Sequence, residues 1–204
     1  MTERGMIFNA EMVRAILDDR KTQTRRPIKW KETRFTEIGE REDGSKWPWS
    51  EDAEHACDFW HPCPFGAVGD RIWVREAFRV HSRATDVATL VYKASERNSW
   101  TEQTRRVPVA VCNKPATPEK WTPSLHMPRW ASRILLEITG VRVERLRSMS
   151  QDDARAEGVI AASGPMEAGL AFRELWDSIY GEESWKATPW VWVIEFKRVE
   201  GGAA

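Results

Sequence analysis

Apolar and polar residues alternate in several short runs of the chain, with the period of two expected of a half-buried β-strand. The predicted strands are a short apolar run at Met6–Phe8, the alternating runs at 71–78, 87–92, 132–146 and 190–196, and a weaker one at 107–111. Gly140 interrupts the run at 132–146, which is therefore one bent strand or two.

Three segments instead repeat their apolar residues every three or four positions, as amphipathic helices do. Asn9 can cap the first of these helices, which is followed by the charged segment that begins at Asp18. Ser150 and Asp153 resemble a capping box at the start of the second helix, and Gly158 is placed to end it. Pro165 begins the third helix, whose broad apolar stripe consists of Leu170, Phe172, Leu175, Trp176 and Ile179.

Two segments show neither period and are rich in glycine, proline and charged residues. They lie at about 30–65 and 95–130, and we expect both to be irregular insertions. Short strands mixed with a few helices, without regular β-α alternation, predict an α+β fold with a curled or barrel-like antiparallel sheet. The expected organisation is a single domain over 1–199, followed by a flexible tail at 200–204.

Composition narrows the functional classes. The 204 residues are 41% hydrophobic, which is enough for one sizeable core, and 31 cationic residues balance 31 acidic ones. A protein that coats nucleic acid nonspecifically would normally be basic, so any nucleic-acid contact should be local. There is no apolar leader or membrane-length apolar run, and the three cysteines suit a reducing compartment. We expect a cytoplasmic protein with no membrane partner and no cofactor.

The densest cluster of candidate chemistry is the charged run from Asp18 to Arg26, in which Lys21 precedes Thr24 by three residues. One turn of chain could bring this amine and hydroxyl together. Burial and the neighbouring arginines would lower the pKa of Lys21, so its neutral amine could take the proton of Thr24. Thr24 would then attack a carbonyl, with Glu157 transferring a proton to the leaving amine. Without family knowledge the spacing is common, and a solvated charge run is the simpler interpretation.

Two glutamates conflict with their local surroundings. Glu76 shares a strand face with apolar residues and needs a partner, so it is either part of a site or half of a structural ion pair. Glu157 lies in the last turn of its predicted helix, at the negative end of the helix dipole. A cation should sit beside it, and Lys21 would serve, although Glu157 could also be a merely exposed helix residue.

A histidine and cysteine cluster suggests zinc at first sight. His55, Cys57, His61 and Cys63 lie within nine residues. However, the single residue within each His-x-Cys pair rarely lets both side chains reach one ion. We therefore predict no metal site.

The motifs that carry a family resemblance are the string with Lys21, Thr24 and Arg26, the run from Gly69 to Glu76, and the closing strand 193–196. Together they resemble the ASCH domain of the PUA-like superfamily. Asp19 replaces the glycine of the family signature, and Thr24 replaces its glutamate. Small bacterial ASCH amidohydrolases that act on N4-acetylcytidine have a similar string with threonine. The resemblance implies catalytic roles for Lys21 and Thr24 and, by a looser alignment, for Glu157.

The chain is also similar, nearly from end to end, to longer ASCH proteins of tailed phages and prophages. The shared segments include those at 63–66, 123–133 and 172–176. This resemblance implies a PUA-like β-barrel with a cleft for a nucleobase, nucleoside or nucleotide. The substrate-binding residues would be Arg26, Arg75, Glu76, His126, Arg129 and Trp130.

The role of these substrate-binding residues stays open in two respects. Plain packing is an alternative for Trp130, because most of the twelve tryptophans must be structural. For the whole protein, two alternatives to a hydrolase remain: a noncatalytic RNA- or DNA-binding module and a nuclease.

Overall fold

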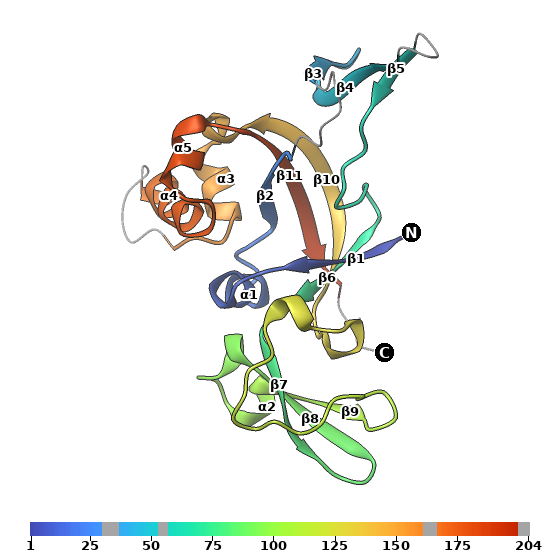
Figure 1. The fold of residues 1–204 in the computed structure, drawn as a ribbon. Helices are drawn as coiled ribbons and strands as arrows, with labels where there is room; N and C mark the ends of the chain where they lie inside the picture. Colours follow the sequence, from blue (N-terminus) through green and yellow to red (C-terminus); the bar gives the residue numbers. More distant parts are fainter. Residues whose placement is uncertain (30–36, 53–56, 161–166, 200–204) are drawn as a thin grey trace. The chain divides into compact units, whose positions relative to one another are not determined.

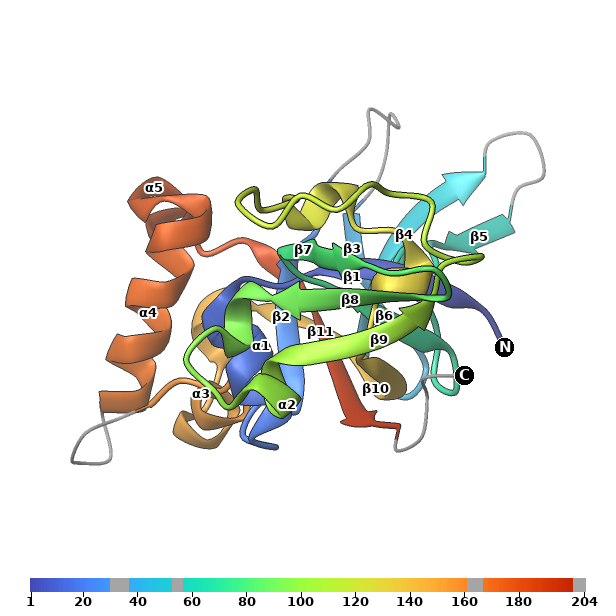
Figure 2. The same ribbon diagram turned by 90° about the horizontal axis from the view of Figure 1, so that it is seen from below.

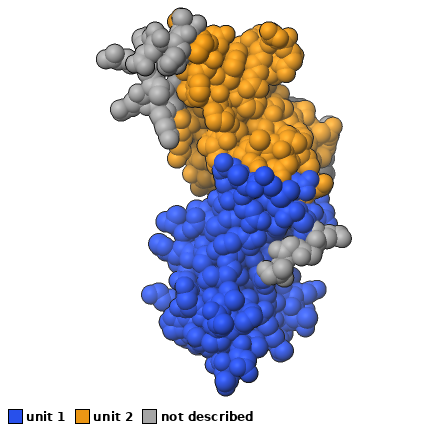
Figure 3. Space-filling model, turned by 90° about the vertical axis from the view of Figure 1, so that its right-hand side faces the viewer, with its two compact units in different colours: residues 1–19, 71–137, 198–204 blue, residues 20–70, 138–197 orange. Residues whose placement is uncertain are grey.

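The computed structural model describes residues 1–29, 37–52, 57–160 and 167–199. The fold is mixed α+β with three sheets (Figure 1), which agrees with the predicted class. The chain forms two compact units that interleave in sequence (Figure 3). Unit 1 comprises residues 1–19, 71–137 and 198–204, and unit 2 comprises residues 20–70 and 138–197.

Unit 1 contains the first part of the largest sheet. Strand β1 (Glu3–Ile7) pairs in parallel with β6 (Arg71–Arg75), and β6 pairs antiparallel with the beginning of β10 (Leu135–Arg145). The parallel pair differs from the expected antiparallel sheet, because helix α1 (Ala10–Leu17) follows β1 where a hairpin would return the chain. Asn9 caps α1 by accepting a hydrogen bond from the Met12 amide, as predicted.

A second sheet of unit 1 is antiparallel and has the order β7-β8-β9 (Figure 2). Its strands are β7 (Phe78–Arg83), β8 (Val87–Tyr92) and β9 (Thr104–Pro108). One face packs onto a core of Phe78, Val80, Leu90, Tyr92, Val107, Met127 and neighbouring small residues. The predicted insertion at 95–130 is therefore partly regular. It also holds helix α2 (Trp100–Gln103) and the short 3-10 turns η2 (Ser124–His126) and η3 (Arg129–Ala131), and turn η1 (Lys93–Ser95) precedes it.

In unit 2, the large sheet continues through β10 to β11 (Trp190–Arg198) and β2 (Gln23–Pro27). Strands β11 and β2 are antiparallel, with Ile194 opposite Thr24 and Val193 opposite Arg25. The order β1-β6-β10-β11-β2 is open at both ends, so the described strands form no closed barrel.

Three helices follow β10 in unit 2: α3 (Gln151–Ala156), α4 (Glu167–Tyr180) and α5 (Glu182–Ala187), with 3-10 turn η4 (Leu146–Ser148) before them. Ser150 and Asp153 form the predicted capping box, and Gly158 has the positive φ of 87° expected just after a helix end. The apolar stripe of α4 is narrower than predicted. Phe172 and Trp176 pack against Val191 and Val193 of β11, whereas Leu170 and Ile179 are 59% and 41% exposed. Pro165 lies outside the described residues.

Within the first predicted insertion, the expectation of irregular structure is wrong for residues 37–52 and 57–60. They form a three-stranded antiparallel sheet of β3 (Glu37–Glu40), β4 (Lys46–Asp52) and β5 (Cys57–Trp60). Proline and acidic residues in these strands hide the alternation. The pairing instead depends on aromatic neighbours, since Trp49 lies opposite Trp60, and Gly39 leaves room for the Trp60 ring.

No helix in the described part of the chain is long and apolar enough to cross a membrane.

Candidate functional site

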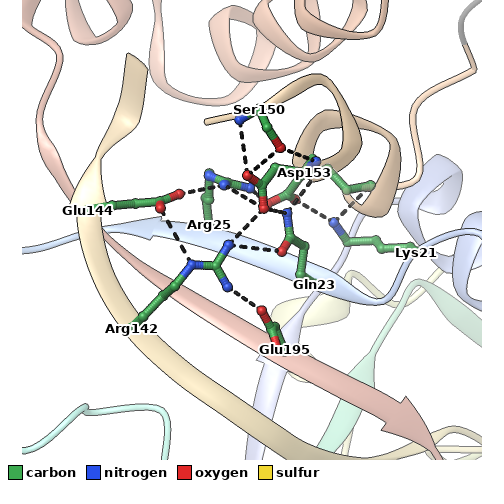
Figure 4. A network of polar contacts seen from close by, with 9 residues as sticks. Lys21, Gln23, Arg25, Arg142, Glu144, Ser150, Asp153 and Glu195 are labelled. Carbon is green, nitrogen blue, oxygen red and sulfur yellow. Dashed lines mark hydrogen bonds and ion pairs between the residues drawn. The ribbon is translucent and has the colours of Figure 1, made fainter. Parts of the chain in front are cut away.

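A network of buried and half-buried charges joins the start of β2 to α3 in unit 2 (Figure 4). Side chains alternate along an extended chain, so Lys21, Gln23 and Arg25 point to the same side. All three contact residues of α3 or its C-cap, namely Asp153 and Glu157. The charged run found in the sequence is therefore one wall of an internal site, and not a solvated face.

Lys21 and Glu157 form the most deeply buried pair of this network. The Lys21 ammonium donates to Glu157 Oε2 at 2.8 Å and to the Glu157 carbonyl oxygen at 2.9 Å. Both side chains are at most 2% exposed. Their backbones also form an isolated antiparallel bridge, which fixes the two residues side by side. The predicted pairing of Lys21 with Glu157 is thus confirmed.

Arg25 holds the other oxygen of the Glu157 carboxylate. Its Nη1 donates to Glu157 Oε1 at 3.1 Å, and its Nη2 donates to Glu144 Oε1 at 2.5 Å. The Arg25 side chain is completely buried, and its guanidinium lies 5.9 Å from the centre of the Phe172 ring. One carboxylate therefore neutralises parts of two buried cations, which fixes its position.

Arg142 forms the solvent-facing end of the network and is 37% exposed. It donates to Asp153 Oδ1 at 2.7 Å and also contacts Glu144 and Glu195. Gln23 donates to the Asp153 carbonyl oxygen at 2.8 Å. The network is thus shielded from solvent at Lys21 and exposed to solvent at Arg142.

Burial and pairing shift three pKa values in this site. Burial lowers the pKa of Lys21 below its ordinary value, although the Glu157 carboxylate acts in the opposite direction. Burial also opposes the charge of Arg25, but Glu157 and Glu144 outweigh it and raise the Arg25 pKa. For Asp153, burial is outweighed by hydrogen bonds from Ser150 and Gln23 and by the charge of Arg25, so its pKa is well below the usual range.

Thr24 lies on the other face of the sheet. It is opposite Ile194, whereas Arg25 is opposite Val193, and Val193 packs under the helices α3 and α4. Directly opposed residues in an antiparallel pair project to the same side, so Thr24 projects away from the helices. The turn expected to bring the Lys21 amine to the Thr24 hydroxyl is replaced by extended chain, and Lys21 donates to Glu157 instead.

Of the predicted substrate-binding residues, Arg26 belongs to unit 2 and the other five belong to unit 1. Arg26 donates to the Tyr180 hydroxyl at 3.4 Å. Arg75 contacts the Leu125 carbonyl oxygen, and Arg129 donates to Glu3 at 2.9 Å. His126 is exposed.

Trp130 and Glu76 are held by the structure of unit 1. Trp130 packs edge-on against Phe78 beside the core, which fits the packing alternative. Glu76 is 2% exposed and accepts two hydrogen bonds from Arg133, at 2.9 and 3.1 Å. This is the structural ion pair named as one alternative for Glu76.

Among the residues that the structure describes, no three or more histidine, cysteine or acidic side chains are grouped to hold a metal ion. His55 lies outside the described residues. His61 instead hydrogen-bonds Ser50 at 2.9 Å, and its ring stacks edge-on against Phe59.

Sequence reasoning missed Gln23, Arg142, Glu144 and Glu195 as members of the network. Their signal was present but weak. Arg142 and Glu144 are charged residues two positions apart in an otherwise apolar strand, and Glu195 interrupts the most apolar strand of the chain. Which of these charges meet is decided by the pairing of strands far apart in sequence.

Comparison with known proteins found no matching family model, curated protein or solved structure.

Proposed function

We propose that the protein hydrolyses an amide on an N-acylated nucleobase, nucleoside or nucleotide, with Lys21 and Glu157 transferring the protons. One observation carries the proposal: a fully buried amine with a lowered pKa lies 2.8 Å from a buried carboxylate. Strongly perturbed ionisable groups with a specific charged partner are typical of sites that move protons. A lysine with its ordinary pKa of about 10.4 would be a poor base at neutral pH.

The proposed chemistry is acyl transfer to an oxygen nucleophile. The lowered pKa of Lys21 favours loss of a proton from its ammonium group, and the resulting neutral amine takes the proton of the nucleophile while the nucleophile's oxygen bonds to the acyl carbon. The proton then passes through the Glu157 carboxylate to the leaving nitrogen, and the carbon–nitrogen bond breaks. With water as nucleophile, the products are a carboxylic acid and the free amine. Arg25 would act as a positioning residue, since it holds the second oxygen of Glu157.

The nucleophile is either Thr24 or water. The sequence predicts Thr24, which would form an acyl ester that a water molecule then cleaves. The strand pairing favours water, because Thr24 projects to the sheet face opposite the Lys21–Glu157 pair. Thr24 as nucleophile therefore stays a prediction.

The substrate class and the assignment of the fold to the PUA-like superfamily come from the family resemblance. The string containing Lys21, Thr24 and Arg26 resembles that of amidohydrolases acting on N4-acetylcytidine. The PUA-like assignment is part of the same proposal. The strongly curved strands β10 and β11 (Figure 1) support it.

A deacylation assay on N4-acetylcytidine and related N-acyl nucleosides tests the proposal. Lys21→Ala and Glu157→Gln should each lower kcat by about 10²–10⁴-fold, the usual contribution of a proton-transferring group. Lys186→Ala is the matched control, because Lys186 is an exposed lysine of the same unit paired with Glu183. Unchanged turnover in both site variants would refute the mechanism. Absence of turnover on every acyl nucleoside by the wild-type protein would refute the activity.

The noncatalytic nucleic-acid module finds less support at this site. The positive charges of Lys21 and Arg25 are already balanced by Glu157 and Glu144, so neither cation offers a phosphate an unpaired charge. A nuclease has no specific observation in its favour.

A further inference from the structure

A second feature lies in unit 1 and is independent of the Lys21 site. Burial alternates without a break from Arg71 to Val80, so every second residue is buried and the residues between them are half-exposed. The half-exposed positions include Arg71, Arg75 and Arg79, which we call the arginine row. Arg71 and Arg75 are the two end residues of β6 and are therefore about 13 Å apart along an extended chain, whereas Arg79 belongs to β7 of the second sheet.

The arginine row is short of counter-charge. In the part of the chain that the structure describes, none of its three guanidinium groups forms an ion pair with a carboxylate. Arg71 lies between Glu3 and Glu137 in the strand register, and it makes an ion pair with neither. This differs from the Lys21 network, where every cation is paired. In a protein of zero formal net charge, Arg75 and Arg79 are therefore positive charges that no carboxylate of the described residues neutralises directly.

Two tryptophans accompany the row. The Arg75 guanidinium lies 5.4 Å from the centre of the Trp73 ring, and the Arg79 guanidinium lies 4.5 Å from that of Trp121. The two tryptophans, like the arginines, are half-exposed. Aromatic rings beside guanidinium groups are the components of surfaces that stack bases and neutralise phosphates.

The position of Trp73 depends on a glycine. A Cβ atom at Gly5 would lie 2.6 Å from Cζ2 of Trp73 and 2.9 Å from Cδ of Arg75. The missing side chain therefore lets the indole ring and the Arg75 stem lie directly against strand β1. Backbone contacts between Phe78 and Thr122, at 2.7 and 3.2 Å, likewise hold Trp121 beside Arg79.

We propose that the arginine row, with Trp73 and Trp121, binds single-stranded nucleic acid. The guanidinium groups, which form no ion pair with a carboxylate among the described residues, would contact phosphates, and the exposed parts of the two indole rings would stack on bases. A single strand suits the surface better than a duplex, because stacking on a protein ring needs an unpaired base. The row lies in unit 1, whereas Lys21 and Glu157 lie in unit 2, and the proposal does not depend on the hydrolytic activity.

Fluorescence anisotropy with labelled oligo(dT) and oligo(U), over a series of salt concentrations, tests the inference. Three phosphate contacts on a single strand predict that log K falls with log salt with a slope of about −2. Arg75→Gln/Arg79→Gln should reduce the slope by about 1.4. Trp73→Ala should weaken binding about fivefold or more at constant salt. Arg75→Lys/Arg79→Lys should keep the slope, because the charge stays.

Arg145→Gln is the control variant. Arg145 also stacks on a tryptophan, Trp190, at 4.4 Å, but it belongs to unit 2. It should bind as the wild type does. Circular dichroism should show each variant folded. The inference is overturned if the wild-type protein does not bind either oligonucleotide at low salt, or if the glutamine pair binds like the control. It is also overturned if duplex DNA or phosphatidylglycerol vesicles bind as tightly as the single strands.

Discussion

Lys21 Nζ lies 2.8 Å from a side-chain oxygen of Glu157 and 2.9 Å from the backbone carbonyl oxygen of the same residue. One residue thus supplies two acceptors to one buried ammonium. Glu157 can do this because it is the C-cap of α3, where the last carbonyl groups of a helix have no partner within the helix. The helix end and the buried lysine therefore satisfy each other, and Gly158 then turns the chain away.

Lys21→Met should destabilise the protein by about 3–5 kcal/mol, because it leaves the buried Glu157 carboxylate with only Arg25 as its partner. Chemical denaturation measures this change. Lys21→Met/Glu157→Gln should recover part of the loss, since glutamine carries no charge that needs a partner. If Lys21→Met unfolds at the same denaturant concentration as the wild type, the Lys21–Glu157 pair has no structural role.

Asp153 should make the protein sensitive to acid. Its pKa is well below the usual range in the folded protein and ordinary in the unfolded chain, so the unfolded state binds the proton more readily. The stabilisation is complete above the unfolded pKa of about 3.9 and is lost as the pH falls toward the folded value.

Asp153→Asn should remove this part of the acid sensitivity. Unfolding free energies measured between pH 2 and 6 should therefore fall less steeply for the variant than for the wild type. Asp152→Asn is the matched control, because Asp152 is the neighbouring carboxylate and its side chain is 91% exposed. Parallel pH curves for wild type and Asp153→Asn would count against the assignment.

Local signals made part of this fold predictable from the sequence. The strand at Val87–Tyr92 was predicted with its observed bounds, because its alternation and flanking turns are contained in one short segment. The capping box at Ser150 was predictable for the same reason. The pairing of Lys21 with Glu157 was predicted because Glu157 lies at the negative end of its helix dipole and Lys21 could supply the cation it needs.

Contacts between residues far apart in the sequence explain which features of the structure the sequence did not reveal. The strands β3 to β5 depend on cross-strand tryptophan contacts that no single segment displays. The sequence did not predict a strand at Gln23–Pro27, so it did not reveal the alternation that places Thr24 opposite Ile194 and away from Lys21. The arginine row was visible as charge but not as unpaired charge, because partners are known only once the strands are arranged.

Arg133→Ala should destabilise the protein by about 3–5 kcal/mol near neutral pH, because Glu76 would be a buried carboxylate without its cation. Burial already raises the pKa of Glu76, and Arg133 opposes this rise. Without Arg133 the pKa should rise further, so Glu76 would take up a proton under mildly acidic conditions. The cost of the variant should therefore shrink as the pH falls from 7 to 5.

Denaturation of wild type and Arg133→Ala at both pH values measures this effect. Arg133→Ala/Glu76→Gln compared with Glu76→Gln provides the control, because neither variant has a carboxylate to protonate at this position and the difference between them should not change with pH. A cost of Arg133→Ala that is equal at pH 7 and pH 5 would show that Glu76 does not depend on Arg133 for its charge.

Thr24→Val decides which oxygen attacks the substrate. Valine keeps the branched shape that a strand position with 1% exposure requires, and it removes the hydroxyl. If water is the nucleophile, Thr24→Val should deacylate N-acyl nucleosides at close to the wild-type rate, because the sheet separates this side chain from Lys21 and Glu157.

Thr24→Ser is the matched variant, because it keeps the hydroxyl and loses a methyl group. A Thr24→Val protein that is folded but slower by 10²-fold or more, beside an active Thr24→Ser protein, would identify the threonine hydroxyl as the nucleophile. That result would also require the start of β2 to leave its extended conformation during catalysis, since the observed pairing directs Thr24 away from the amine.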